Sequence, residues 1–69
     1  MNVLEAILRI AVCWERSTDE KFNMHDITGV FVDSFGDIEF YMRGCDRYRI
    51  CYNSCFVEKY NVWKGYVRI

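Results

Sequence analysis

The sequence predicts a single α+β domain over residues 1–69, in which an N-terminal amphipathic helix packs on one face of an antiparallel β-meander of three to five strands. Two observations predict this fold. Apolar residues recur at helical spacing near the N-terminus, and they alternate with polar residues in several short segments after residue 27. One helix followed by a run of strands is typical of α+β proteins.

The helix is predicted to run from Val3 to about Arg16. Asn2, followed by Glu5 three residues later, resembles a capping box, in which side chains bond the free N–H groups of the first turn. A narrow polar stripe completes the helix and consists of Glu5, Arg9 and Arg16. The segment Ser17–Asp26 that follows is polar, and we expect at most a short helical turn at its start.

Two apolar sets share the helix. The first has the spacing of a core-facing stripe and is expected to pack on the sheet: Leu4, Ile7, Leu8 and Ala11. The second runs along the neighbouring edge: Val3, Ile7, Ile10 and Trp14. Together they make the helix apolar over more than half of its circumference, which is more than a one-sided core requires. We therefore expect the helix to contact more than one surface.

Three strands are predicted next, with two further elements after them. The three strands are Ile27–Asp33, Asp37–Arg43 and Arg47–Asn53, joined by three-residue turns at residues 34–36 and 44–46, each of which contains a glycine. Residues 55–60 are compatible with either a strand or a short helix, and Val62–Ile69 is predicted to be the last strand.

The turn lengths predict the register of the sheet. With three residues in each turn, Val32 faces Ile38 and Phe40 faces Ile50, so that every even-numbered residue lies on one side. The predicted sheet side of the core therefore consists of Val30, Val32, Ile38, Phe40, Met42, Tyr48, Ile50 and Tyr52.

The cysteines do not have the spacing of a metal site. Cys45, Cys51 and Cys55 lack the two close pairs that structural zinc sites usually present, and Cys13 lies far upstream. We interpret all four as free thiols and expect no metal and no cofactor. The alternative, a disulfide such as Cys45 to Cys55, would require an oxidising compartment.

No catalytic pattern is present. His25 beside Asp26 has the residue types of a general base and its orienting acid, but adjacent residues rarely orient each other and no motif places a nucleophile. Phosphate-binding glycine loops, the nucleophile elbow and the zinc-protease motif are all missing. The sequence therefore favours a protein that is not an enzyme.

The side of the sheet opposite the helix is expected to carry a cluster of arginines with a tyrosine. In the predicted register Arg43 faces Arg47 and Tyr41 faces Arg49. Guanidinium groups beside an aromatic ring suit phosphates and stacked bases. One hypothesis is therefore a nucleic-acid or nucleotide-binding patch of Tyr41, Arg43, Arg47 and Arg49; the other is a solvated face in which nearby acids offset the arginines.

The chain has more large apolar side chains than one helix on a small sheet can cover. It is 52% hydrophobic and 17% aromatic, and aromatic residues dominate the energetics of protein interfaces. The surplus predicts a contact surface for a protein partner or a second copy, and the candidate interface residues are Val3, Ile10, Trp14, Phe35 and Trp63.

These observations favour a non-catalytic protein-binding module, expected to be a homodimer that acts as an inhibitor or adaptor, as do small phage or mobile-element proteins that block a host defence enzyme. Binding of nucleic acid or a nucleotide is the alternative function. With 9 Lys+Arg against 10 Asp+Glu, the net charge of -1 gives no general attraction to nucleic acid or anionic lipid. No secretion signal or membrane-spanning segment is seen, so we expect no membrane association and a cytoplasmic location.

Overall fold

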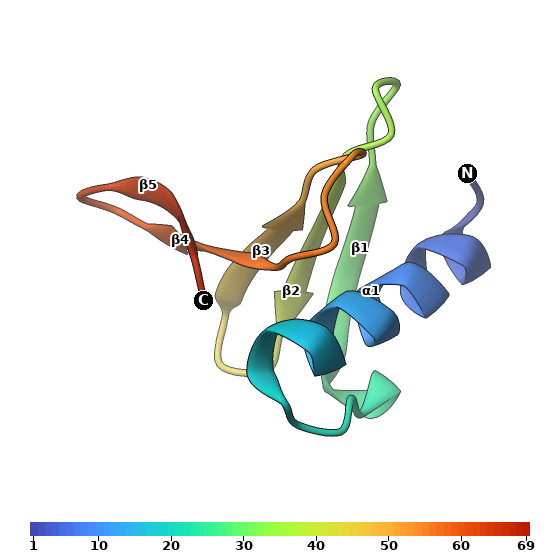
Figure 1. Ribbon diagram of the computed structural model, residues 1–69, viewed down its shortest axis with the longest axis horizontal. Coiled ribbons are helices and arrows are strands. Elements are labelled where there is room, and N and C mark those ends of the chain that lie inside the picture. Colours follow the sequence, from blue (N-terminus) through green and yellow to red (C-terminus); the bar gives the residue numbers. More distant parts are fainter.

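The computed structural model describes residues 1–69 and confirms the α+β fold, with one long helix packed against a five-stranded antiparallel sheet (Figure 1). The strands pair in chain order, so the sheet is a simple meander. The elements are α1 (Val3–Thr18), the 3-10 turn η1 (Met24–Asp26), β1 (Ile27–Val32), β2 (Ile38–Met42), β3 (Asp46–Ile50), β4 (Glu58–Asn61) and β5 (Gly65–Arg68).

The predicted start of α1 is confirmed, and its end lies two residues later than expected. The Asn2 side-chain oxygen accepts a hydrogen bond from the Glu5 backbone N–H at 2.8 Å, as an N-cap does. At the other end, Asp19 takes the left-handed conformation (φ 58°) and its N–H donates to the Glu15 carbonyl. The helical turn expected near Ser17 is therefore the last turn of α1.

The face of α1 that packs on the sheet differs from the predicted one. Ala6, Ile10 and Cys13 are buried, whereas Leu4 and Leu8 are 65% and 59% exposed. The prediction that Leu4, Ile7, Leu8 and Ala11 face the core was therefore wrong. Of these four residues, Ile7 and Ala11 are only half-buried, at the margin of the face that packs on the sheet. Because α1 is apolar over more than half of its circumference, its periodicity could not single out one face.

The register of β1 against β2 is as predicted from Val30 to Val32, but a bulge between Ile27 and Gly29 places Ile27, and not Thr28, opposite Met42. The register of β2 against β3 is shifted by two residues. Val32 pairs with Ile38, as expected, but Phe40 pairs with Tyr48 rather than with Ile50. The turn occupies residues 43–45 instead of 44–46, with both Gly44 and Cys45 at positive φ. A shift of two residues keeps every side chain on its own face, so the alternation of the strands could not reveal it.

The core lies between α1 and the even-numbered residues of β2 and β3. Its sheet side is as predicted for Ile38, Phe40, Met42, Tyr48 and Ile50, and Val30 and Val32 pack at its edge. Tyr52 was wrongly included, because β3 ends at Ile50 and the Tyr52 side chain is exposed in the following loop. Val57, later in that loop, is fully buried instead.

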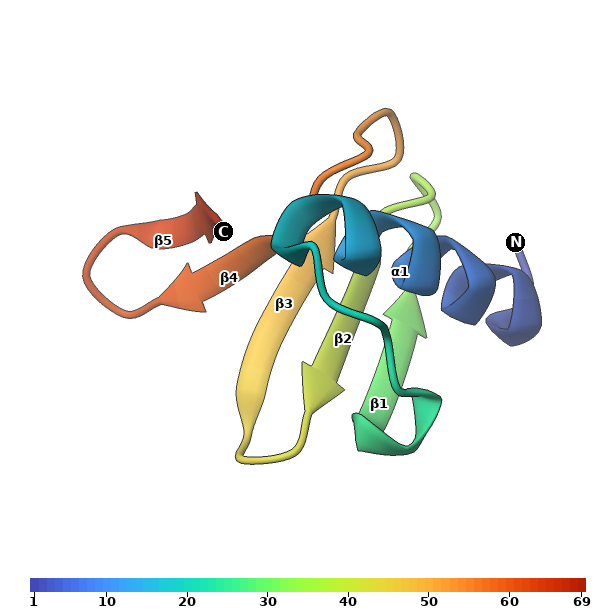
Figure 2. The same cartoon turned by 60° about the horizontal axis from the view of Figure 1, so that its bottom comes forward.

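The C-terminal elements form a hairpin that extends beyond the helix (Figure 2). Of the two options for residues 55–60, the strand is correct, although β4 begins only at Glu58. The expected strand Val62–Ile69 is shorter, since residues 62–64 form the turn and β5 starts at Gly65. No residue of β4 or β5 is buried. Neither helix combines the length and the apolar character needed to cross a membrane.

Candidate functional site

Two residues of the predicted anion patch, Tyr41 and Arg47, share one carboxylate on the sheet face opposite α1. They pair directly across β2 and β3. Arg47 Nε lies 2.8 Å from Glu39 Oε1, and the Tyr41 hydroxyl donates to the same oxygen at 2.8 Å. The hydrogen bond to Glu39 favours the protonated phenol and so raises the pKa of Tyr41. The polar groups of both residues are thus already engaged within the chain.

Arg49 is paired in a similar way, with a residue of β4. Its Nη2 donates to Glu58 Oε1 at 2.9 Å, and its guanidinium lies 4.0 Å from the centre of the Tyr66 ring. The Tyr66 hydroxyl also accepts a hydrogen bond from Arg47 Nε at 2.9 Å. Tyr66 therefore joins the two arginines. Tyr66 was not among the residues predicted from the sequence, because it belongs to β5 and the position of β5 beside the arginines depends on the packing of the hairpin.

An open hollow of about 230 Å³ lies on this face. It is lined by Phe31, Asp33, Asp37, Ile38, Glu39, Arg47, Arg49 and Tyr66. Three carboxylates therefore face two guanidinium groups, which gives the lining one net negative charge. Such a lining provides less attraction for a phosphate than the arginine cluster expected from the sequence.

Arg43 does not belong to this patch. It lies in the turn between β2 and β3, where its side chain is exposed and its Nε is 3.7 Å from a carboxylate oxygen of Asp26. The predicted pairs Arg43 with Arg47 and Tyr41 with Arg49 were wrong, because the turn is placed one residue earlier than expected. The structure therefore brings together only Tyr41, Arg47 and Arg49.

Two of the predicted partner-contact residues belong to the core. Ile10 has no exposed surface. Trp14 is partly buried and makes edge-to-face contacts with Tyr48 and Phe40, at centroid distances of 5.2 Å and 6.4 Å. Ile10 is therefore not available to a partner, and its place in the expected interface was wrong, whereas Trp14 offers only the part of its ring that these contacts leave exposed.

The other three predicted contact residues are exposed but lie far apart. Val3, Phe35 and Trp63 are 58%, 79% and 90% exposed. Val3 lies in the first turn of α1, Phe35 in the loop between β1 and β2, and Trp63 in the turn between β4 and β5. These three segments lie at different ends of the molecule (Figure 1). They do not form a single surface.

The sequence analysis missed the most continuous exposed apolar surface, which we call the outward ridge of α1 and which consists of Leu4, Leu8 and Val12. Each is about 60% exposed. Residues four apart lie one above the other along a helix, so the three side chains form one row. The signal was present in the spacing of these residues, but the same spacing was interpreted as the core-facing stripe.

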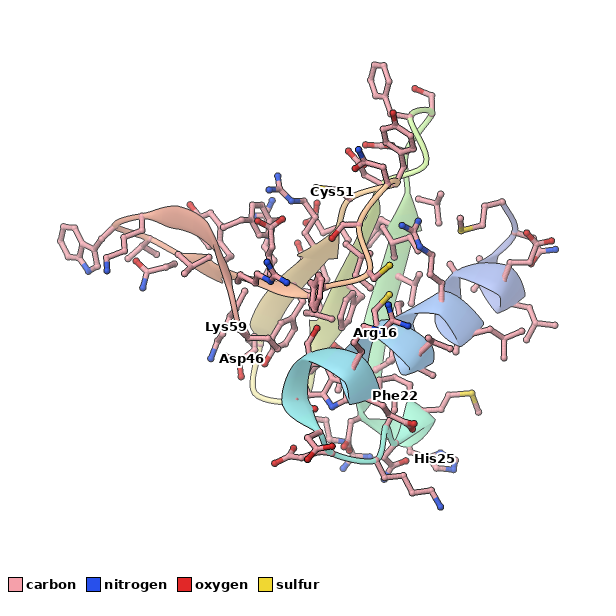
Figure 3. The ribbon with its side chains drawn as sticks, viewed as in Figure 1. Arg16, Phe22, His25, Asp46, Cys51 and Lys59 are labelled. Atoms are coloured by element: carbon pink, nitrogen blue, oxygen red, sulfur yellow. The ribbon has the colours of Figure 1, made fainter.

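The fold does not gather His25 and the cysteines into one cluster. His25 is exposed near η1, far from Cys51 at the end of β3 (Figure 3), and Asp26 pairs with Arg43. No group of three or more His, Cys, Asp or Glu side chains is arranged to hold a metal ion. Comparison with known proteins adds no assignment, because no protein-family model, no curated protein and no solved structure matches this chain.

Proposed function

We propose that this chain is a non-catalytic protein-binding module, an inhibitor or adaptor, that pairs with a second copy of itself through the outward ridge of α1. The observation that carries the proposal is the exposure of Leu4, Leu8 and Val12 in one row on α1. Single exposed apolar residues are ordinary on protein surfaces, whereas a contiguous row is typical of a contact surface.

The geometry of the ridge suits a symmetric helix pair. Rows of side chains spaced by four are the ridges that interlock when two helices cross. In an antiparallel pair centred on Leu8, Leu4 of each copy packs against Val12 of the other. In this register the residue numbers of facing positions sum to 16, so that each contact is made twice, once by each copy. The row is thus complementary to itself, as the interface of a symmetric dimer must be, and this supports a second copy as the occupant.

The area that a stable dimer requires defines how far the contact extends. A typical specific interface buries about 800 Å² on each partner. The chain exposes 4875 Å² in total, so such a contact covers about a sixth of its surface. Three side chains do not supply that area. The proposed interface therefore includes the residues of α1 that flank the ridge at a spacing of three or four, Ala11 and Glu15.

Size-exclusion chromatography with light scattering over a wide concentration range tests the proposal. We expect the wild-type protein to be a dimer and Leu8→Glu to be a monomer, because the substitution places a carboxylate at the centre of the pair. Val62→Glu is the control, since Val62 is also apolar and exposed (74%, against 59% for Leu8) but lies in the β4–β5 turn. We expect that variant to remain dimeric.

The thermal unfolding of Leu8→Glu shows whether the variant is folded, and we expect it to be close to that of the wild type at low concentration, since Leu8 makes no core contact. A wild-type protein that stays monomeric at every concentration would contradict self-association. A dimer that survives Leu8→Glu would contradict the ridge as its interface.

Binding of nucleic acid or a nucleotide is the second candidate function. It is favoured by Arg47 and Arg49 lying together beside the Tyr66 ring at the open hollow. The Glu39 and Glu58 carboxylates that pair with these arginines weaken it. Fluorescence anisotropy with a labelled single-stranded oligonucleotide tests it. Binding that weakens as salt rises and is lost in Arg47→Ala/Arg49→Ala would support this function, and no binding at low salt would exclude it.

A further inference from the structure

A segment of the loop between β3 and β4 lies along α1, held by a hydrogen bond at each end. Arg9 Nη2 donates to the Ser54 carbonyl at 2.9 Å, and the Val57 N–H donates to the Ser17 hydroxyl at 2.9 Å. Arg9 and Ser17 are eight residues apart in the helix and therefore lie in one row, two turns from each other. The loop segment consequently follows this row of the helix.

The helix row and the loop segment each have a cysteine between the two residues that form these hydrogen bonds. Cys13 lies midway between Arg9 and Ser17 on the helix, and Cys55 lies between Ser54 and Val57 in the loop. The two thiols are therefore brought to the same place, although they come from opposite ends of the chain. Cys13 is 4% exposed, Cys55 is exposed, and both are free thiols.

The ionisation of Cys13 reflects this neighbourhood. Burial raises the pKa of the Cys13 thiol above its ordinary value, and the neighbouring Cys55 sulfur adds to the rise. The Arg9 guanidinium acts in the opposite direction through its charge and a hydrogen bond. Cys13 is thus a protonated thiol at neutral pH, with a cation beside it that favours the thiolate whenever it forms.

The other two cysteines are not placed to react with this pair. Cys45 and Cys51 flank β3 at its two ends, about 20 Å apart at roughly 3.3 Å per residue. A disulfide needs Cα atoms within about 7 Å. Arg9 Nη2 contacts the carbonyl oxygens of both Cys51 and Ser54, so Cys55 lies at the Cys51 end of β3, and this fold does not bring it to Cys45. The Cys51 thiol is directed instead at Glu58 Oε1, 3.6 Å away.

We propose that Cys13 and Cys55 form a reversible disulfide when the chain meets an oxidising small-molecule disulfide of the glutathione class. This site is independent of the proposed pairing through the outward ridge, which lies on another face of α1. The Cys13–Cys55 pair is a site of thiol modification, and the molecule that reacts there is the small-molecule disulfide.

The reaction proceeds by two thiol–disulfide exchanges. The exposed Cys55 loses its proton to solvent and its thiolate attacks one sulfur of the oxidant. The S–S bond of the oxidant breaks, one small thiolate leaves, and Cys55 carries a mixed disulfide. The Cys13 thiolate then attacks the Cys55 sulfur and expels the second small thiolate. Two protein thiols are oxidised by two electrons in total, and the oxidant is reduced to two thiols, which take up the two protons.

The product ties α1 to the loop after β3. Residues 13 and 55 are 42 positions apart (55 − 13), so the bond closes a long loop of the unfolded chain. Closing a loop of this length destabilises the unfolded state, and for a domain of this size we expect the melting temperature to rise by roughly 10 °C or more.

The test starts from reduced, purified protein at low concentration, which is treated with oxidised glutathione and then alkylated. We expect the intact mass to show a monomer that has lost two hydrogens and keeps two alkylatable thiols. Peptide mapping without reduction should link the peptides of Cys13 and Cys55. Cys45→Ser and Cys51→Ser are the matched controls, and both should still form the bond.

Cys55→Ser should abolish the bond, and because Cys55 is exposed, the reduced variant should melt at the same temperature as the reduced wild type. Cys13→Ser should also abolish it, although this substitution adds a buried hydroxyl and lowers stability. The proposal is overturned if oxidation stops at a mixed disulfide with glutathione, if mapping links a different pair, or if only intermolecular disulfides form.

Discussion

The covered part of the sheet and the β4–β5 hairpin are built from similar strands but are stabilised differently. In β2, every second residue is buried beneath α1. In β4 and β5 no residue is buried, although their side chains include tyrosines and a valine. The hairpin extends past the end of the helix, so neither of its faces is covered (Figure 2). The sequence of a strand thus indicates which residues share a face, and the position of the helix decides whether that face is buried.

The hairpin depends instead on contacts between its exposed side chains. Tyr60 and Tyr66 pack edge to face at 5.4 Å, and Arg49 lies over the Tyr66 ring. Such contacts contribute about 1 kcal/mol each, whereas a buried core side chain contributes several. We call α1 and the strands that it covers the body of the molecule. The body and the hairpin should therefore respond very differently to the loss of a side chain.

The largest difference is expected between an aromatic residue of each part. Phe40→Ala should lower the free energy of unfolding by about 3–5 kcal/mol, because Phe40 is fully buried and its removal leaves a cavity. A chain of this length has a total stability of roughly 3–10 kcal/mol, so much of the protein should unfold. Trp63→Ala, at the exposed hairpin tip, should change stability by less than about 0.5 kcal/mol. Urea unfolding measures both, and similar losses would contradict the division into body and hairpin.

An intermediate effect is expected at Arg9, which links α1 to the loop leading into the hairpin. Its Nη2 contacts the carbonyl oxygens of Cys51, Tyr52 and Ser54 at 2.6 to 2.9 Å. Arg9→Met keeps the apolar part of the side chain but removes these charge-assisted bonds, and should cost about 2 kcal/mol. Arg16→Met, on the exposed side of the same helix, is the control and should be nearly neutral. Thermal unfolding of the two variants compares them, and equal melting temperatures would show that Arg9 does not hold the loop.

An effect smaller than that at Arg9 is expected from a contact within the hairpin itself. Tyr66→Ala removes the ring beneath Arg49 and the hydroxyl bonded to Arg47, which should cost about 1 kcal/mol. Because the hairpin has no buried residue, the loss should appear as faster amide hydrogen exchange in β4 and β5, with little change in β1 and β2. Tyr52→Ala serves as the control, because its side chain is exposed in a loop. Uniformly faster exchange across the sheet would show that the hairpin unfolds together with the body.

The start of the helix, the first three strands and the faces of β2 and β3 follow from the sequence alone. The Asn2 cap follows from local hydrogen bonding within one turn, and the buried positions of β2 and β3 follow from a two-residue alternation that the pleat imposes. These features need no information from distant parts of the chain. The α+β fold and the buried set from Ile38 to Ile50 were therefore predicted correctly.

The tertiary structure decided what local patterns leave equivalent. A helix that is apolar over more than half of its circumference can pack through more than one face, and only the fit against the sheet placed Ile10 inside and Leu8 outside. A two-residue shift preserves strand faces, so only the folded turn showed that Tyr41, and not Arg43, faces Arg47. The meeting of Cys13 with Cys55 and of Tyr66 with Arg49 likewise joins distant segments. Such contacts depend on the packing of whole elements, and neither periodicity nor spacing along the chain encodes that packing.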